Sequence, residues 1–500
     1  MSFAALVIAG VLASSFAGGG AAFAESTPPP TPAPTASGAP TASVATTAAA
    51  GAGAHLTLAA TVDNGASDRP AAVGEFVLTA TGDFGEVHGV TGSPAVTDAA
   101  VRSDRYVLGF QGPSRYTPEW SCDGGEFIPE NWIDGPATIV LDEDDAATCS
   151  VVLVAKVVLH VTAGGDRLAS GAVAGVAGVT FRAHAYYRPV RFRPDELPVT
   201  ITGTCTTDAA GSCDIEVGVI SAADQALNFS YWVTALNPAP AGWSLIPEFL
   251  QTGDGGHSTY TYANYVNVPP GTAGQRVDVS RAGLTYPSGT PVNGPFPLAR
   301  TSALPHRCTG PLKIALAFDT SSSMTAAKLQ VAKDAAAAAL GPAGLGGRDT
   351  RVTIYSFAHT AKKLTPVPFP LSNIAGRVAA IGLVKSLAAE SGQDRTNVDG
   401  LYRRVAADGP YDLVLVVSDG IATEDAAGRL GVNQTVQLAH PVVFSANRIK
   451  AQTGPAGKPS AIFGIGAWNS GAVTGGTAVP RSESVPKVSA DLHALVTGCG

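Results

Sequence analysis

Charged side chains are scarce in this sequence of 500 residues, at 14%, and they show no basic excess. The formal net charge is −8. Proteins that bind nucleic acids in general need dense positive charge to displace counterions from phosphates, so this composition argues against that class. From residue 310 to the end 18 Lys and Arg accompany 13 Asp and Glu, whereas upstream the numbers are 14 and 27. The C-terminal part is therefore chemically distinct.

Long apolar runs are missing after residue 24, where no stretch reaches the roughly 18 residues of a membrane-spanning helix. Residues 1–24 hold a short apolar run that ends in Ala22-Phe23-Ala24, which fits a signal-peptidase site. Serines and glycines interrupt the run, which disfavours the alternative of a membrane anchor. We interpret residues 1–24 as a signal peptide. We expect a secreted, extracellular protein, either released or held at the cell surface.

Motifs of common enzymes are also absent. The sequence has no His-Glu-x-x-His, no Gly-x-Ser-x-Gly and no phosphate-binding Gly-x-x-x-x-Gly-Lys. We therefore expect a protein that is not an enzyme.

Cysteines are few, at six, and none forms a Cys-x-x-Cys pair. In an exported protein they are expected to form disulfides rather than metal sites. Six cysteines allow many pairings, but their grouping along the chain favours one bridge in each domain. The expected bridges are Cys122–Cys149, Cys205–Cys213 and Cys308–Cys499.

Turn-forming residues are abundant, with 57 glycines and 36 prolines, which argues against a helical bundle. Residues 25–54 are rich in Pro, Ala and Thr, and we expect a disordered linker there. Residues 55–156 and 157–284 contain short apolar or alternating segments between turns, which predicts two all-β sandwiches. Residues 285–307 contain several prolines and are expected to form an interdomain linker, with a structured extension of the second sandwich as the alternative.

Two stretches of the second sandwich are typical of a known family. Cys205-Thr-Thr-Asp-Ala-Ala-Gly-Ser-Cys213 is a turn-rich loop between two alternating strands, and Tyr231-Trp232-Val233 is followed by Gly242-Trp243. With these features both blocks resemble the prealbumin-like (Cna-B/SpaA-like) modules of bacterial surface proteins. Many such modules carry a Lys–Asn isopeptide crosslink that starts in the first strand. Neither first strand here contains lysine, so we expect disulfides to stiffen these modules instead.

Residues 308–500 have a different periodicity, in which apolar strands alternate with helix-forming segments. The strands are expected at 312–318, 350–358, 411–419 and 460–468, and the strongest helix former lies at 325–340. This alternation predicts an α/β domain with a doubly wound, Rossmann-like parallel sheet. In such sheets ligands bind beyond the carboxyl ends of the strands.

Carboxylates and hydroxyls stand at the places where these segments end or begin. The set comprises Asp319, Ser321 and Ser323 after the first strand, Thr396 before a helix, and Asp419 at the end of strand 411–419. Asp and Ser before a helix are also ordinary N-caps, so Asp-x-Ser-x-Ser alone is weak support for a metal site. The combination of three segments at one sheet edge is stronger support.

These motifs are similar to the metal-ion-dependent adhesion site of the von Willebrand factor type A (VWA) fold. The resemblance implies that Asp319, Ser321, Ser323, Thr396 and Asp419 bind Mg²⁺ directly or through water, with Mn²⁺ or Ca²⁺ as alternatives. It also leaves a sixth position on the ion for an acidic group of a partner. Two carboxylates among neutral hydroxyls leave net positive character at the ion, which attracts such a group.

One local departure from the VWA pattern precedes Thr396. Asp394-Arg395 stands where members of that family commonly have glycine. We expect the Arg395 guanidinium to pair with Asp399 or to weaken ion binding.

The sequence thus predicts a multidomain bacterial adhesin-like protein, secreted or on the cell surface, with two prealbumin-like sandwiches and a metal-dependent VWA domain. Its expected partner is a protein from a host, a matrix or a neighbouring subunit that presents an acidic residue. The alternative is a structural pilus or cell-envelope component whose VWA domain mediates subunit assembly.

Overall fold

The computed structural model describes most of the chain after residue 52. The described residues are 53–129, 136–187, 202–226, 229–245, 249–253, 256–260, 265–279, 294–301, 311–342, 344–345, 349–390, 392, 395–418, 422–428, 436–457 and 459–465. The expected signal peptide, almost all of the expected disordered linker, Cys308, Asp419 and Cys499 lie outside these residues.

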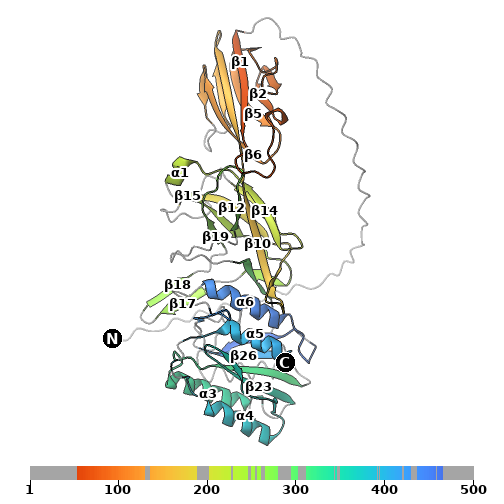
Figure 1. The fold of residues 1–500 in the computed structure, drawn as a ribbon, viewed down its shortest axis with the longest axis vertical. Helices are drawn as coiled ribbons and strands as arrows, with labels where there is room; N and C mark the ends of the chain where they lie inside the picture. Colours follow the sequence, from red (N-terminus) through yellow and green to blue (C-terminus); the bar gives the residue numbers. More distant parts are fainter. Residues whose placement is uncertain are drawn as a thin grey trace, which may run out of the picture. The chain divides into compact units, whose positions relative to one another are not determined.

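The first β module covers the described residues up to Ala155 (Figure 1). Its elements are β1 (Ala54–Asp63), the short 3₁₀ helix η1 (Val73–Glu75), β2 (Val77–Gly82), β3 (Gly85–Gly89), β4 (Ala99–Val101), β5 (Asp104–Gln111), β6 (Tyr116–Asp123), β7 (Glu126–Ile128), β8 (Thr138–Leu141) and β9 (Ala146–Ala155). They form two sheets, ordered β4-β1-β9-β6 and β3-β2-β5-β8-β7. Alternate apolar residues, such as Leu56 and Leu58 of β1, are buried in one core, as half-buried strands require.

The second β module begins at Val157, directly after Lys156, and has a core of its own. Its elements are β10 (Val157–Arg167), β11 (Val173–Gly175), β12 (Thr180–Tyr187), β13 (Thr202–Thr206), β14 (Ser212–Val217), α1 (Ala222–Ala226), β15 (Phe229–Ala235), β16 (Trp243–Leu245), β17 (Phe249–Gly253), β18 (Gly256–Tyr260), β19 (Tyr265–Val268), β20 (Arg276–Asp278) and β21 (Phe296–Arg300). One sheet has the order β11-β10-β21-β16, with β14 and β20 also on β10, and another has the order β13-β12-β15-β19. Strands β17 and β18 form a hairpin.

Strand β21 corrects the expectation of a linker at 285–307. Its residues pair with β10 in parallel and with β16 in antiparallel fashion, and Phe296 and Leu298 are buried in the core of the second β module. The prolines of this stretch are compatible with a strand that makes only two ladder pairs with β10. Residues 296–300 therefore form a structured extension of the second sandwich, which was the alternative that the sequence left open.

Two disulfides stiffen the β modules. Cys122 of β6 faces Cys149 of β9 as a directly opposite cross-strand pair, and the two are bonded. Cys205 of β13 is bonded to Cys213 of β14, across the turn that carries Asp208. Both pairings are those predicted from the grouping of the cysteines.

The α/β part covers the described residues from 311 to 465. Its elements are β22 (Leu312–Asp319), α3 (Ala326–Leu340), β23 (Thr350–Phe357), β24 (Ala361–Lys363), β25 (Phe369–Pro370), α4 (Ile374–Ser386), α5 (Val398–Asp408), β26 (Leu413–Val417), α6 (Val436–Lys450) and β27 (Ala461–Ile465). The sheet order is β24-β23-β22-β26-β27, with β25 on β23. All neighbours among β23, β22, β26 and β27 are parallel. The short strands β24 and β25 are antiparallel to β23 and were not expected from the sequence.

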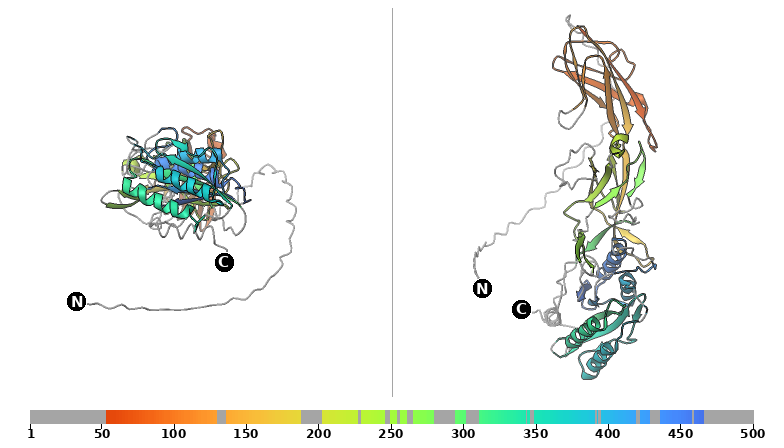
Figure 2. Two further views of the ribbon diagram at one scale, coloured as in Figure 1. Left: turned by 90° about the horizontal axis from the view of Figure 1, so that it is seen from below. Right: turned by 90° about the vertical axis from the view of Figure 1, so that its left-hand side faces the viewer.

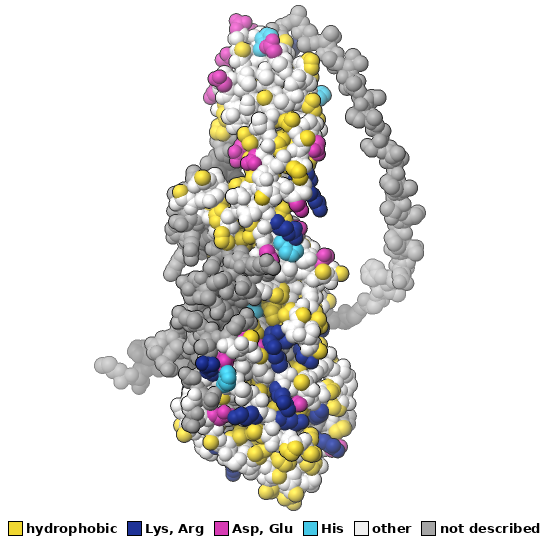
Figure 3. All heavy atoms as spheres, viewed as in Figure 1, with side chains coloured by type: hydrophobic (Ala, Val, Ile, Leu, Met, Phe, Trp, Pro, Cys, Tyr) yellow, Lys and Arg dark blue, Asp and Glu magenta, His cyan; other side chains and the backbone are white. Residues whose placement is uncertain are grey.

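Helices cover both faces of this sheet, which explains why its strands are apolar at nearly every position (Figures 1 and 2). Leu316 and Phe318 of β22 pack in a core with α3 and α4, whereas Ala315 and Ala317 pack in a second core with α5 and α6. On the face drawn in Figure 3, most Lys and Arg side chains lie over this part of the protein. Among the described residues, no helix is long and apolar enough to span a membrane.

Candidate metal centre

The carboxylate of Asp319 lies at the end of the central strand β22. Strands β22 and β26 run parallel with Phe318 opposite Val417, so the next residues, Asp319 and Ser418, leave the sheet side by side. The Ser418 hydroxyl donates a hydrogen bond of 2.6 Å to Asp319 Oδ2, and the backbone N–H of Ser321 donates one of 2.9 Å to Oδ1. Asp319 is 0% exposed. The strand register thus places a fixed, buried carboxylate at the carboxyl edge of the sheet.

Three hydroxyl groups gather beside this carboxylate. Ser321 Oγ lies 3.0 Å from Ser323 Oγ, and Thr396 Oγ1 donates a hydrogen bond of 3.0 Å to the same Ser321 oxygen. Ser321 and Thr396 are buried, whereas Ser323 is exposed. The cluster is therefore formed within the fold and reaches solvent at Ser323.

A tight turn after β22 positions the two serines. The backbone N–H of Met324 donates to the carbonyl of Ser321, and that of Thr325 donates to the carbonyl of Ser323. Thr325 then caps α3, because its hydroxyl accepts a hydrogen bond from the Lys328 N–H. Thr325 is therefore the N-cap of α3, and Asp319, Ser321 and Ser323 are not. Capping of α3 does not explain why these three residues stand here.

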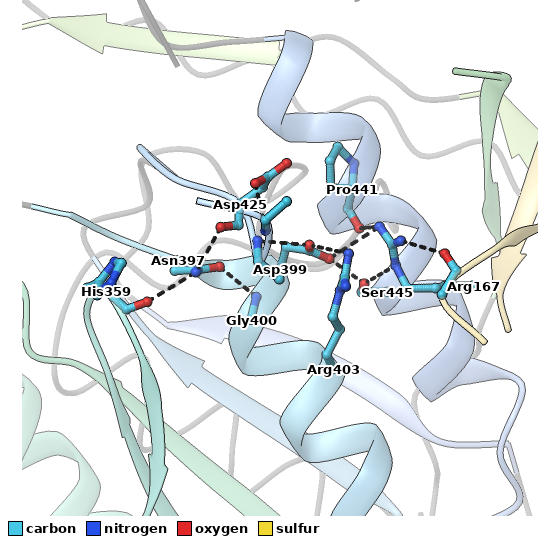
Figure 4. A network of polar contacts seen from close by, with 12 residues as sticks. Arg167, His359, Asn397, Asp399, Gly400, Arg403, Asp425, Pro441 and Ser445 are labelled. Carbon is cyan, nitrogen blue, oxygen red and sulfur yellow. Dashed lines mark hydrogen bonds and ion pairs between the residues drawn. The ribbon is translucent and has the colours of Figure 1, made fainter. Parts of the chain in front are cut away.

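Thr396 is held from two sides by backbone contacts. Its N–H donates to Thr423 Oγ1 at 2.8 Å, and its carbonyl accepts from the N–H groups of Thr423 and Glu424. Asn397 next to it caps α5 by accepting from the Gly400 N–H, and its amide donates to the carbonyls of His359 and Asp425 (Figure 4). The hydroxyl of Thr396 is therefore placed by the end of β23 and by the segment 423–425.

This donor set fits a hard divalent cation. Ligand oxygens that are neighbours around an octahedral Mg²⁺ lie about 2.9 Å apart, since each Mg–O bond is roughly 2.0–2.1 Å long. The hydroxyl oxygen of Ser321 lies at about this spacing, 3.0 Å, from those of Ser323 and Thr396. Within the described residues no group of three or more His, Cys, Asp and Glu side chains could hold a metal. A metal centre formed by these described residues would rest on the three hydroxyls together with the Asp319 carboxylate.

The structure brings together four of the five predicted metal ligands, namely Asp319, Ser321, Ser323 and Thr396. Asp419 lies outside the described residues, but Ser418 directly before it contacts Asp319. The hydroxyl of Ser418 was not predicted to take part, although it belongs to the same Ser-Asp-Gly motif. Thr423 was also missed, and no pattern in the sequence marks it.

Arg395 does not make the predicted contact with Asp399. Its guanidinium forms an ion pair with Glu424 at 3.2 Å, and the same buried carboxylate contacts His359 Nδ1 at 2.5 Å. Asp399 is instead paired with Arg403, one helical turn later on α5, and with Arg167. The backbone contacts of Glu424 with Thr396 bring its carboxylate next to Arg395, which local sequence spacing does not indicate.

Comparison with known proteins identifies the fold of the first β module. Residues 49–151 match a family model described as a prealbumin-like fold domain, so the first β module has this fold, as its sequence predicts. No curated protein matches the chain.

Several solved structures resemble the chain at low identity. A VWA protein from Catenulispora acidiphila is 15% identical over 40% of this chain and 43% of its own, with a TM-score of 0.28. The pilus adhesin SpaC from Lactobacillus rhamnosus GG is 16% identical over 37% of this chain and 30% of its own, with a TM-score of 0.28. The mussel byssus protein PTMP1, described with a zinc-occupied metal-ion-dependent adhesion site, is 18% identical over 38% and 46%, with a TM-score of 0.26. The chain thus spans less than half the length of each.

Proposed function

We propose that the α/β part is a VWA-type domain that binds Mg²⁺ through Asp319, Ser321, Ser323, Thr396 and Asp419. The observation that carries this proposal is the hydroxyl cluster: two segments 75 residues apart place their hydroxyls 3.0 Å apart beside a buried aspartate. Mn²⁺ and Ca²⁺ are the alternative ions. The role we propose is binding rather than catalysis.

In this proposal a bound divalent cation supplies Lewis acidity toward an acidic side chain of a protein partner. The residues of the chain hold and orient the site. Ser418 and the Ser321 N–H fix both oxygens of Asp319, and Thr423 fixes Thr396. Exposure of Ser323 leaves an approach for the partner.

The two β modules support a location outside the cell. The prealbumin-like first module and the two disulfides are features of exported surface proteins. We propose a secreted or surface-displayed adhesin-like protein in which these modules carry the metal-dependent domain. The second candidate, a pilus or envelope subunit, uses the same site to bind a neighbouring subunit.

Calorimetric titration of the full chain with Mg²⁺, Mn²⁺ and Ca²⁺ tests the metal centre. We expect one binding site in the wild type and a more than about hundredfold loss of affinity in Asp319→Ala, because the buried carboxylate is the only charged ligand among the described residues. Ser323→Ala is expected to weaken binding, whereas Ser322→Ala, at the exposed neighbouring position, is the matched control. Equal affinities in wild type and Asp319→Ala would reject the proposal.

Binding of protein partners tests the function. An immobilised acidic protein or matrix component that is retained in Mg²⁺ should be released by EDTA and bound again after Mg²⁺ is restored. Asp319→Ala should abolish retention while circular dichroism shows a folded protein. Retention of a second copy of this chain, rather than of a foreign protein, would favour the subunit-assembly alternative.

A further inference from the structure

Arg167, the last residue of β10, reaches from the second β module into the α/β part (Figure 4). It is only 8% exposed. Its guanidinium donates to Ser445 Oγ at 2.8 Å, to the Pro441 carbonyl at 3.3 Å and to Asp399 Oδ1 at 3.4 Å. A further bond to the Gly171 carbonyl holds it to its own module. A buried arginine with this many partners is an organised contact rather than a surface ion pair.

Asp399, the acceptor of this contact, is completely buried in the first turn of α5. Its Oδ1 also accepts a hydrogen bond of 2.5 Å from Ser445, and its Oδ2 accepts from the Ala426 N–H and pairs with Arg403. A buried carboxylate is costly unless cations and donors compensate it. Arg403 supplies one such cation from the same helix, and Arg167 supplies another from a different module.

Helix α6 completes the contact between the two parts of the chain. The amide of Asn447 donates to the backbone carbonyls of Gly165 in β10 and Leu298 in β21, and its oxygen accepts from the Arg300 N–H. Asn447 is completely buried, and its bonds occupy backbone groups where β10 and β21 no longer pair with each other. The residues that contact Arg167 on α6 are therefore held firmly against the second β module.

Asp399 is directly connected to the segments that position Thr396. It lies three residues after Thr396 on the same chain segment, and it accepts from Ala426 in the loop whose Thr423 and Glu424 bind the Thr396 backbone. Asn397, between the two, donates to the Asp425 carbonyl of that loop. Compensation of the Asp399 charge thus stabilises both segments around the Thr396 hydroxyl.

We propose that Arg167 is a positioning residue for the metal centre. By pairing with Asp399 it fixes segments 396–399 and 423–426, so that the state of the second β module and the affinity of the metal centre are coupled. The effect on metal affinity rests on the proposed function, whereas the effect on the two segments does not.

The first test is metal affinity in the full chain, measured by Mn²⁺ calorimetry in Arg167→Ala and Arg167→Lys at a temperature where both are folded. We expect Arg167→Ala to weaken Mn²⁺ binding at least about fivefold, the scale of typical coupling between sites. Lysine keeps the charge without the planar fork, so Arg167→Lys should recover part of the affinity. Arg182→Ala, which removes an exposed arginine from β12 of the same module, is the matched control and should change nothing.

The second test needs no metal. Hydrogen exchange of the Thr396, Asn397 and Ala426 amides, all bonded in the structure, should be at least about tenfold faster in metal-free Arg167→Ala than in Arg182→Ala. If wild-type protein binds no metal but exchange accelerates, the proposed function fails and the positioning role stands. If exchange is unchanged and Arg167→Ala and Arg167→Lys both bind Mn²⁺ within twofold of wild type, the positioning role is rejected. Should Arg167→Ala not fold, the same comparison between Arg167→Lys and wild type decides it.

Discussion

The two ends of the parallel sheet each bury an aspartate, Asp319 at the carboxyl edge and Asp412 at the amino edge, and both are 0% exposed. Asp412 directly precedes β26, and its carboxylate accepts from the backbone N–H groups of Lys313 and Ala456 at 2.8 and 3.0 Å. Asp319 instead accepts from one backbone N–H and one hydroxyl, and lies beside the hydroxyl cluster.

The difference lies in what the surrounding donors can do. Backbone N–H groups can only donate, so the two that bind Asp412 join β22 to the loop after α6 and have no lone pair for a cation. Hydroxyl groups both donate and accept, and those of Ser321, Ser323 and Thr396 can turn their lone pairs toward a cation. Under the proposed function, equal burial of the same residue type therefore serves structure at one edge and binding at the other.

Replacing each of the two aspartates by alanine should give the largest effects on stability and on metal binding. Asp412→Ala leaves the partly buried N–H groups of Lys313 and Ala456 without their acceptor, and we expect a loss of roughly 2 kcal/mol in the free energy of unfolding with Mg²⁺ affinity kept within about twofold. Asp319→Ala should abolish binding, and its stability should fall by a similar amount, roughly 2 kcal/mol, because the buried Ser321 N–H and Ser418 hydroxyl also lose their acceptor. The two variants should therefore differ in binding rather than in stability. Urea unfolding and calorimetry on both variants measure this. Loss of binding in both variants to the same degree would abolish the distinction between the two edges.

A second comparison concerns the modules that carry no hydroxyl cluster. Replacing Cys205 and Cys213 together by serine removes a crosslink that closes a short loop, which should cost about 2.5 kcal/mol of unfolding free energy. Metal affinity of the folded protein should not change, because the bridge joins β13 to β14 and neither strand carries a residue of the Arg167 contact or of the hydroxyl cluster. A fall in Mg²⁺ affinity of the folded variant would show that the site depends on more than the carboxyl edge and the Arg167 contact.

Two buried threonines allow a test of whether hydroxyl groups bind the cation. Thr396→Val removes the hydroxyl that bonds to Ser321 with little change of volume, and we expect about tenfold weaker Mg²⁺ binding, or about 1.4 kcal/mol. Thr353 in β23 is equally buried, and among the described residues its hydroxyl has no hydrogen-bond partner. Thr353→Val should therefore leave affinity unchanged and stability equal or higher. Similar affinity losses in both variants would point to packing rather than ligation.

The buried side chain of Lys450 should give a pH dependence of the free energy of unfolding. Burial lowers the pKa of Lys450 in α6 to about 7, whereas the unfolded chain titrates near the usual value for lysine. Between these values the unfolded state binds more protons, so the stability of the wild type should rise with pH above 7 relative to Lys450→Met. The slope for one proton is at most about 1.4 kcal/mol per pH unit. Urea unfolding at pH 7, 8 and 9 measures it, and parallel curves for the two proteins would contradict the assignment.

The sequence was sufficient to predict the gathering of the candidate ligands at one sheet edge. Apolar strands buried on both faces are recognisable from composition, and parallel strands must end at a common edge. Ser321 and Thr396 could therefore be placed together without coordinates. The disulfide Cys205–Cys213 was predictable for a similar reason, since the cysteines flank one short turn.

Contacts between distant segments could not be predicted in the same way. Arg167 and Asp399 are separated by 232 positions, and nothing in either local pattern indicates their pairing. Local spacing suggested Arg395 as the partner of Asp399, but Arg403 at the next helical turn and Arg167 from another module occupy that carboxylate. Strand β21 was likewise hidden, because its prolines suggest a linker and its partner β10 lies far upstream.

The central claim is that the hydroxyls at the carboxyl edge ligate a divalent cation. Anomalous diffraction from crystals of the full chain grown with Mn²⁺ tests it most directly. We predict a single strong anomalous peak at bonding distance, about 2.0–2.4 Å, from the hydroxyl oxygens of Ser321 and Ser323. Well-ordered density for these serines with no peak beside them, or a peak only elsewhere in the molecule, would contradict the account.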